Sequence, residues 1–253
     1  MQLACDVRGP HDGPPVVFVG SLGTTTALWR DQVDALSPFV RCISIDLPGH
    51  GRSPVRPAPF GVDDIARDVL ETLDHLDIRR ATFVGLSIGG MVGQWLASNA
   101  GERVDRLAVL CSATTVPDPQ AFRDRARDVR RHGGAGHLVG SLLTRWFTPD
   151  YRAARPAELQ RITRMVESIP AEGYAGCAEA LGGADLRPDL PKITVPVLVV
   201  SGAQDAALPP SCSRDIAARI SGARYVELDP AAHLACVERA DAVNALLRDF
   251  LEG

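Results

Sequence analysis

The feature that most constrains the fold of this chain is a serine between two glycines, where a predicted strand meets a predicted helix. Residues 81–84 form a short apolar run, which predicts a strand. Gly85-Leu86-Ser87-Ile88-Gly89 follows, and the apolar residues beyond it predict a helix. A Gly-x-Ser-x-Gly turn in this context is typical of a sharp bend that exposes the serine. Such a turn can also exist for packing alone, so it predicts a nucleophile only if its chemical partners follow.

Short apolar runs alternate with amphipathic stretches on both sides of this turn. The predicted strands are residues 3–7, 16–19, 41–45, 81–84, 107–111, 197–201 and 225–228. The predicted helices between and after them are residues 26–36, 62–76, 214–220 and 240–251. Unbroken apolar strands alternating with helices are typical of a mostly parallel sheet that is covered on both faces. We therefore expect an α/β fold with a mostly parallel central sheet flanked by helices.

The alternation stops in the middle of the chain. Between residues 117 and 191 there is no convincing strand, and arginine-rich helical stretches are separated by glycine and proline. These stretches are residues 121–131, 137–147, 157–168 and 172–180. We expect residues 117–191 to form a helical cap inserted between two strands of a core made of residues 1–116 and 192–253.

Composition excludes several classes of partner. The net charge is −4 and the isoelectric point about 5.9, which does not indicate nucleic-acid or anionic-membrane binding. No stretch is apolar enough to span a membrane, and the early charges predict no signal peptide. The six cysteines are scattered and form no Cys-x-x-Cys pair, so they predict buried thiols in a reducing compartment. We expect a cytoplasmic protein with no metal site.

Two residues that a serine nucleophile requires appear later in the chain, in a recognisable order. Asp205 follows the strand of residues 197–201, and His233 follows the strand of residues 225–228. A general base must activate the serine, and an acid must orient that base. Carboxyl ends of parallel strands meet at one edge of a sheet, so we expect Ser87, Asp205 and His233 to form a catalytic triad. Singly, Asp205 could be a turn residue and His233 a buried structural histidine.

The remaining histidines fit this role less well. His50 lies between two glycines and is expected to make a structural hydrogen bond under the site, and His75 lies in a helix. The other three, which neighbour glycine, proline or arginine, are expected in surface loops: His11, His132 and His137. The alternative acids fall inside the cap region: Asp185 and Asp189.

Acyl transfer also needs two backbone N–H groups that stabilise the oxyanion. One is expected from Ile88, the residue after the nucleophile. The loop Gly20-Ser21-Leu22-Gly23 follows an early strand, and we expect Leu22 to supply the other. Without the triad, this loop would be interpreted as a plain glycine turn.

The sequence resembles the α/β-hydrolase family over nearly its whole length and, within it, the 3-oxoadipate enol-lactonases of the β-ketoadipate pathway. The segments that carry the resemblance are Ser21-Leu22-Gly23-Thr24, Gly49-His50-Gly51-Arg52-Ser53, Gly85 to Leu96, Glu102 to Leu107, Arg145-Trp146-Phe147-Thr148 and Ala231 to Ala235. Two positions near the expected pocket mouth depart from it. Gly20 stands where asparagine is expected, and Asp46-Leu47-Pro48 stands where an arginine is usual.

The resemblance implies hydrolysis of a small lactone, with 3-oxoadipate enol-lactone as the expected substrate, in aromatic catabolism. Such a substrate carries a carboxylate, and Arg145 is its expected partner; alternatively, Arg145 is a solvated arginine of the cap. Trp146 is expected to pack over the lactone ring; alternatively, it packs in the core of the cap. Acyl transfer through side chains requires no cofactor. The same triad could serve an esterase, a C–C bond hydrolase or a tailoring lactonase, and the fold could also carry a non-hydrolytic ligand-binding protein. The sequence does not reveal the oligomeric state.

Overall fold

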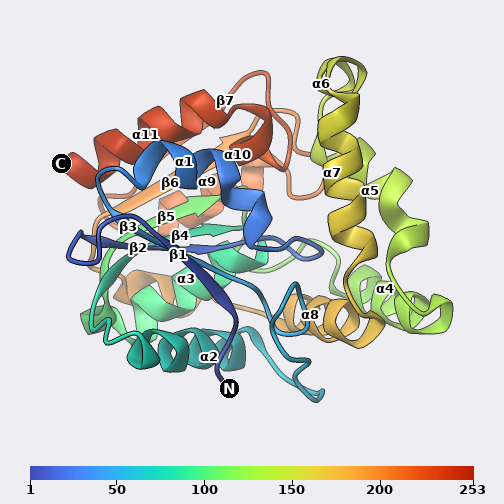
Figure 1. Ribbon diagram of the computed structural model, residues 1–253, viewed down its shortest axis with the longest axis horizontal. Helices are drawn as coiled ribbons and strands as arrows, with labels where there is room; N and C mark the ends of the chain where they lie inside the picture. Colours follow the sequence, from blue (N-terminus) through green and yellow to red (C-terminus); the bar gives the residue numbers. More distant parts are fainter.

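The structure is a computed structural model that describes all residues, 1–253, and a seven-stranded sheet runs through its centre (Figure 1). The strand order is β1-β3-β2-β4-β5-β6-β7, and only the edge pair β1 and β3 is antiparallel. The strands are β1 (Cys5–Arg8), β2 (Pro15–Val19), β3 (Arg41–Ile45), β4 (Ala81–Leu86), β5 (Val104–Leu110), β6 (Val197–Gly202) and β7 (Arg224–Leu228). The predicted mostly parallel sheet is confirmed.

Helices cover both faces of this sheet, which is why its central strands are apolar without alternation. Every residue of β4 and β6 is buried. In Figure 1, α1 and α11 lie on one face, and α2 and α3 lie on the other. The helices that belong to the core around the sheet are α1 (Arg30–Leu36), α2 (Val62–His75), α3 (Ile88–Asn99), α9 (Pro210–Arg219), α10 (Ala235–Glu238) and α11 (Ala240–Glu252). Short 3₁₀ helices complete it: η1 (Thr26–Trp29), η2 (Gly101–Arg103) and η4 (Leu190–Lys192).

Five further helices lie between β5 and β6 and form the inserted cap, at the right of Figure 1. They are α4 (Pro119–His132), α5 (Val139–Trp146), α6 (Pro149–Ala154), α7 (Pro156–Glu167) and α8 (Ala171–Gly183), with η3 (Gly136–Leu138) before α5. The cap contains no named strand, as expected from the sequence. Its buried side chains, such as Leu142 and Tyr174, belong to the same apolar core as the sheet residues Phe18 and Val109. The cap therefore packs against the sheet through a shared core.

Two short helices were not expected from the sequence. α6 begins where the Thr148 side chain accepts a hydrogen bond from the Tyr151 N–H, and Pro149 occupies the first helical position. α10 comes directly after the loop that carries His233. Both are too short to show a helical repeat of apolar residues, so periodicity could not indicate them.

No helix has the length and apolar character needed to cross a bilayer. All six cysteines are free thiols. Four are buried as expected, whereas Cys5 and Cys212 are only half-buried. Burial raises the pKa of the Cys42 thiol to about 11, so this thiol stays protonated and unreactive at neutral pH.

Candidate active site

Ser87 lies on the strained turn between the end of β4 and the start of α3. Its backbone has φ 57° and ψ −117°, a conformation that residues other than glycine rarely adopt. A Cβ on Gly85 would lie 2.2 Å from the Gly89 carbonyl oxygen, and a Cβ on Gly89 would lie 2.0 Å from the Val19 carbonyl oxygen. Both glycines are therefore required for β2, β4 and α3 to approach this closely. The turn is held because the Ser87 N–H donates to the Leu110 carbonyl at 3.0 Å.

Asp205 and His233 meet as the sequence predicts, on the loops after β6 and β7. The Nδ1 of His233 lies 2.7 Å from the Oδ2 of Asp205, and both side chains are buried. The other carboxylate oxygen, Oδ1, accepts hydrogen bonds from the Ala207 N–H at 2.8 Å and the Leu208 N–H at 2.9 Å. Both oxygens of the Asp205 carboxylate therefore act as hydrogen-bond acceptors. The imidazole must donate to it from Nδ1, which leaves Nε2 free to accept a proton.

Ser87 and His233 line one cavity, which brings the predicted nucleophile and base to the same space. The Ser87 Oγ forms no hydrogen bond within the chain. Hydrogen bonds between catalytic groups are often long in ligand-free enzymes and tighten when substrate binds. The arrangement can accommodate a serine nucleophile, and the catalytic roles stay predictions.

The N–H groups of the two predicted oxyanion donors make no hydrogen bond to the protein. Leu22 also lines the cavity, and its N–H makes no hydrogen bond to the protein. Ile88 is the first residue of α3, so its N–H has no carbonyl partner within the helix. The loop between β2 and η1, which contains Leu22, is fixed at its start because the Gly89 N–H of α3 donates to the Gly20 carbonyl at 3.2 Å.

His50 supports this loop from below, as a structural histidine. Its Nδ1 lies 3.0 Å from the Pro48 carbonyl, and its Nε2 accepts a hydrogen bond from the Gly23 N–H at 3.1 Å. A carbonyl can only accept, so the ring is the neutral tautomer with hydrogen on Nδ1. Complete burial lowers the pKa of His50 to about 4, which keeps it neutral at physiological pH.

The cap covers the cavity above Ser87 and leaves it narrow. The cavity has a volume of about 40 Å³, room for roughly three water molecules, so a substrate enters only if cap side chains move. Arg145 and Trp146, both predicted to contact substrate, line it. Sequence reasoning missed the five other cap residues that do so: Phe122, Arg125, Leu142, Tyr174 and Leu181. The cap is tied to the base, because the Leu234 N–H next to His233 donates to the Trp146 carbonyl at 3.0 Å.

Arg125 and Arg145 place positive charge in this cavity without a protein carboxylate to neutralise it. Neither forms an ion pair, and the only hydrogen bond of Arg145 runs from its Nε to the Ser141 carbonyl. Burial and then the charge of Arg125 lower the pKa of Arg145. The buried hydroxyl of Tyr174 has no hydrogen-bond partner, although both guanidiniums lie close enough to lower its pKa against the raising effect of burial. Two unpaired cations and an unpaired hydroxyl at one cavity suit an anionic ligand.

A larger hollow of about 410 Å³ lies elsewhere, where α6 and α7 face α10 and α11. It is lined mainly by charged side chains that include Arg30, Glu158 and Glu238. It contains no serine, cysteine or histidine, so it lacks the nucleophile and the imidazole of the predicted triad. The smaller cavity at Ser87 is the candidate active site.

Comparison with known proteins agrees with the fold. A family model described as the alpha/beta hydrolase fold matches residues 14–240. The chain belongs to the α/β-hydrolase family. This confirms the predicted fold class and the predicted class of enzyme, a carboxylic-ester hydrolase.

Within this family the chain is similar to proteins of more than one name. It is 36% identical to 3-oxoadipate enol-lactonase 2 of Acinetobacter baylyi, over 93% of this chain and 88% of that protein. A crystal structure of the enol-lactonase from Burkholderia xenovorans LB400 superposes with a TM-score of 0.96 at 40% identity, covering 99% of this chain and 96% of that one. A relative from Variovorax paradoxus with the provisional name carbamate hydrolase RutD is 32% identical, over 99% of this chain and 96% of that protein.

Proposed function

We propose that this α/β-hydrolase opens a small carboxylated lactone, 3-oxoadipate enol-lactone, through an acyl-enzyme on Ser87. The observation that carries the proposal is the pair of unpaired arginines, Arg125 and Arg145, at the same cavity as Ser87 and His233. A neutral ester would offer neither guanidinium an anionic partner, and Arg125 would keep only its contact with the Phe122 ring, 4.8 Å away. The similarity to two enol-lactonases supports the same substrate.

The proposed reaction begins with the buried pair of Asp205 and His233. His233 removes the proton from the Ser87 hydroxyl through Nε2 as the oxygen attacks the lactone carbonyl. Asp205 stabilises the imidazolium that forms, since it already accepts the Nδ1 hydrogen. The N–H groups of Leu22 and Ile88 stabilise the oxyanion, and one such donor is typically worth about 3 kcal/mol.

The ring opens when His233 returns its proton to the ring oxygen, which leaves as an enol. An enol oxygen is less basic than an alkoxide, so this step requires less of the acid. Because the leaving group stays covalently attached to the acyl chain, the ring-opened acyl-enzyme contains every atom of the lactone. Water activated by His233 then hydrolyses the ester at Ser87 and releases the free acid.

The proposed substrate contacts come from the cap. Arg125 and Arg145 pair with the substrate carboxylate, and the Tyr174 hydroxyl donates to it. Trp146 packs beside the lactone ring, since its indole and the Tyr174 ring lie against the loop at Gly23. In this proposal residues 117–191 form the unit that recognises substrate, while residues 1–116 and 192–253 form the core that carries the catalytic groups.

The test is turnover of 3-oxoadipate enol-lactone by purified protein, followed as loss of its ultraviolet absorbance. We expect saturable hydrolysis that the Ser87→Ala variant lacks while it keeps the fold by circular dichroism. Simple aryl esters and a simple carbamate serve as comparison substrates, the carbamate because some relatives carry the name carbamate hydrolase. Hydrolysis of these without turnover of the enol-lactone would refute the proposed substrate and leave a hydrolase of another ester.

A further inference from the structure

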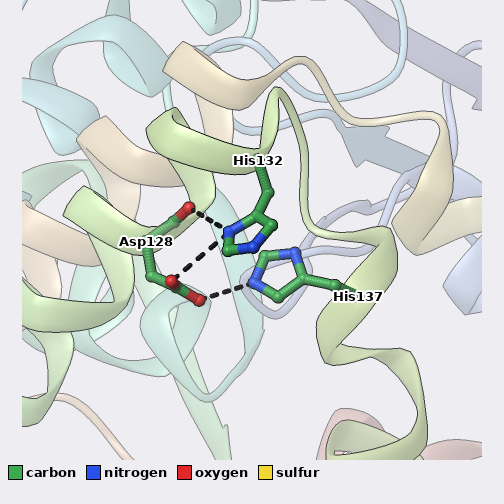
Figure 2. Close-up of side chains that lie close together, drawn as sticks. All are labelled: Asp128, His132 and His137. Atoms are coloured by element: carbon green, nitrogen blue, oxygen red, sulfur yellow. Dashed lines mark hydrogen bonds and ion pairs between the residues drawn. The ribbon is translucent and has the colours of Figure 1, made fainter.

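A second cluster of chemically active side chains lies in the cap, outside the cavity at Ser87. Asp128 and His132 lie one turn apart in α4, and His137 follows the Gly133-Gly134 turn in η3 (Figure 2). One ligand atom from each of the three side chains lies within 4.8 Å of the other two. The imidazoles are stacked, with ring centroids 4.1 Å apart. Two imidazoles and a carboxylate, all common zinc ligands, therefore lie close together at the end of α4.

Both histidines place Nδ1 against a backbone carbonyl. The Nδ1 of His132 lies 3.0 Å from the Asp128 carbonyl, and the Nδ1 of His137 lies 3.1 Å from the Gly134 carbonyl. A backbone carbonyl only accepts, so each Nδ1 carries hydrogen, and the Nε2 of His132 makes no hydrogen bond. The Nε2 of His137 faces a carboxylate oxygen of Asp128, which also only accepts, so this nitrogen must release its hydrogen before it can bind a metal. A histidine that binds a metal through one nitrogen usually donates from the other to such a carbonyl. The supporting bonds of a metal site are thus present at both rings.

We propose that Asp128, His132 and His137 bind one Zn²⁺ ion through the two Nε2 atoms and a carboxylate oxygen. Two imidazoles and one carboxylate suit zinc, which takes three protein ligands and a water in open tetrahedral sites. At present the His137 Nε2 lies 2.6 Å from the Asp128 Oδ2. Bonds of about 2.0–2.1 Å to a tetrahedral ion place neighbouring ligand atoms about 3.3 Å apart. The His137–Asp128 pair therefore needs to open by about 0.7 Å. The three ligand atoms lie within 4.8 Å of one another, and the half-exposed Asp128 side chain and the exposed His132 ring can adjust to close the remaining distance.

The ion would fix the turn that separates two substrate-facing helices. α4 ends at His132 and carries Arg125, whereas α5 begins directly after η3 and carries Arg145. A metal that joins the last turn of α4 to η3 closes the connection between these helices. The site itself is independent of the proposed substrate, because none of its ligands lines the cavity at Ser87.

One neighbouring charge opposes the ion. The Arg131 guanidinium lies 3.4 Å from the Asp128 Oδ1 and repels a divalent cation. We therefore expect Arg131→Gln to bind Zn²⁺ more tightly than the parent chain. If Arg131 and Asp128 only stabilised the helix as an ion pair, Arg131→Gln would not raise the affinity for Zn²⁺.

The experiment is calorimetric titration of Zn²⁺ into the full-length, tag-free protein after treatment with a chelator. We expect one equivalent to bind, His132→Ala and His137→Ala each to weaken binding at least about tenfold, and Arg131→Gln to tighten it. His75→Ala is the matched control, because Glu71 and His75 repeat the spacing of acid and histidine at the end of α2 without a second imidazole. It should bind as the parent does.

Co²⁺ provides a second readout, since a four-coordinate site gives intense visible absorption that the His132→Ala and His137→Ala variants should lack. Circular dichroism shows whether each variant is folded, and the Arg131→Gln result does not depend on losing a ligand. The proposal is overturned if the parent chain binds no zinc, or if a chain with both histidines replaced binds it equally well.

Discussion

The bonds around Asp205 predict a large loss of activity in the conservative variant Asp205→Asn. The two N–H groups of Ala207 and Leu208 hold Oδ1, at 2.8 and 2.9 Å. An asparagine must present its carbonyl oxygen to these donors, because the flipped amide would break two buried hydrogen bonds at a cost of about 1–3 kcal/mol each. Its NH₂ group therefore faces the Nδ1 of His233. The imidazole must then accept at Nδ1 and carry hydrogen on Nε2, where it cannot remove the proton of Ser87.

The expected effect is a fall in kcat of about 10⁴-fold, or about 5.5 kcal/mol of transition-state stabilisation, as for other triads whose imidazole is held in the wrong tautomer. KM and the midpoint of thermal unfolding should change little, because shape and hydrogen-bond count are kept. The assay is steady-state hydrolysis of the enol-lactone, with Asp229→Asn as the control for a loop aspartate after a strand. Asp229 bonds only to Gln204, so its variant should remain active. A kcat for Asp205→Asn within about tenfold of the parent would show that Asp205 does not orient the base.

Three further predictions test the cavity, its support and the turn. Arg125→Gln and Arg145→Gln should each lower kcat/KM for the carboxylated lactone by about 10- to 150-fold, the loss expected when one hydrogen bond to a charged group is removed. Hydrolysis of the neutral methyl ester of the same lactone should be unaffected. Equal losses on both substrates would exclude carboxylate binding. Burial holds the pKa of His50 at about 4 in the folded chain, below its ordinary value of 6.5. Between these pH values the unfolded chain binds a proton at His50 that the folded chain does not. The free energy of unfolding therefore falls by about 3 kcal/mol as the pH drops from 6.5 to 4. In urea unfolding at both pH values, His50→Gln should lack this part of the loss, and an unchanged pH dependence would contradict it. Gly89→Ala should cost about 3 kcal/mol or more because its Cβ meets a carbonyl oxygen of β2, whereas Gly140→Ala, with open space around it, should be neutral or stabilising in the same unfolding assay.

The sheet and the elbow could be predicted from sequence because their signals are local. Unbroken apolar runs mark the buried strands, and the residues after β4, β6 and β7 must meet at one edge of a parallel sheet. This rule alone predicts the neighbourhood of Ser87, Asp205 and His233. It needs no knowledge of how the helices pack.

The cap could be predicted as helical but not in its contacts. Which face of α4 turns toward Ser87 depends on its packing against α8, so Arg125 looked like any of the many cap arginines. Tyr174 gave no signal either, because its unpaired hydroxyl is a property of the folded cavity. Arg145 was identified only through resemblance to a family.

The histidines of the cap lie at the surface as expected, but in helical turns rather than in loops. His132 and His137 were expected in surface loops, yet His132 is the last residue of α4 and His137 lies in η3. Zinc sites are predicted from sequence through known spacings of cysteine and histidine. An acid four residues before a histidine gives no such signal, because this pair is common on any helix. Only the turn at Gly133, with φ 73°, brings the second imidazole back over the first.

The central claim is that Ser87 attacks a carboxylated enol lactone, and its most direct test is rapid acid quenching of the reaction followed by peptide mass spectrometry. Ring opening adds every atom of the lactone to the enzyme, so the peptide that contains Ser87 should gain the full mass of one lactone molecule. The Ser87→Ala chain should show neither this adduct nor turnover. An adduct on another residue, or enol-lactone hydrolysis by Ser87→Ala, would contradict the account.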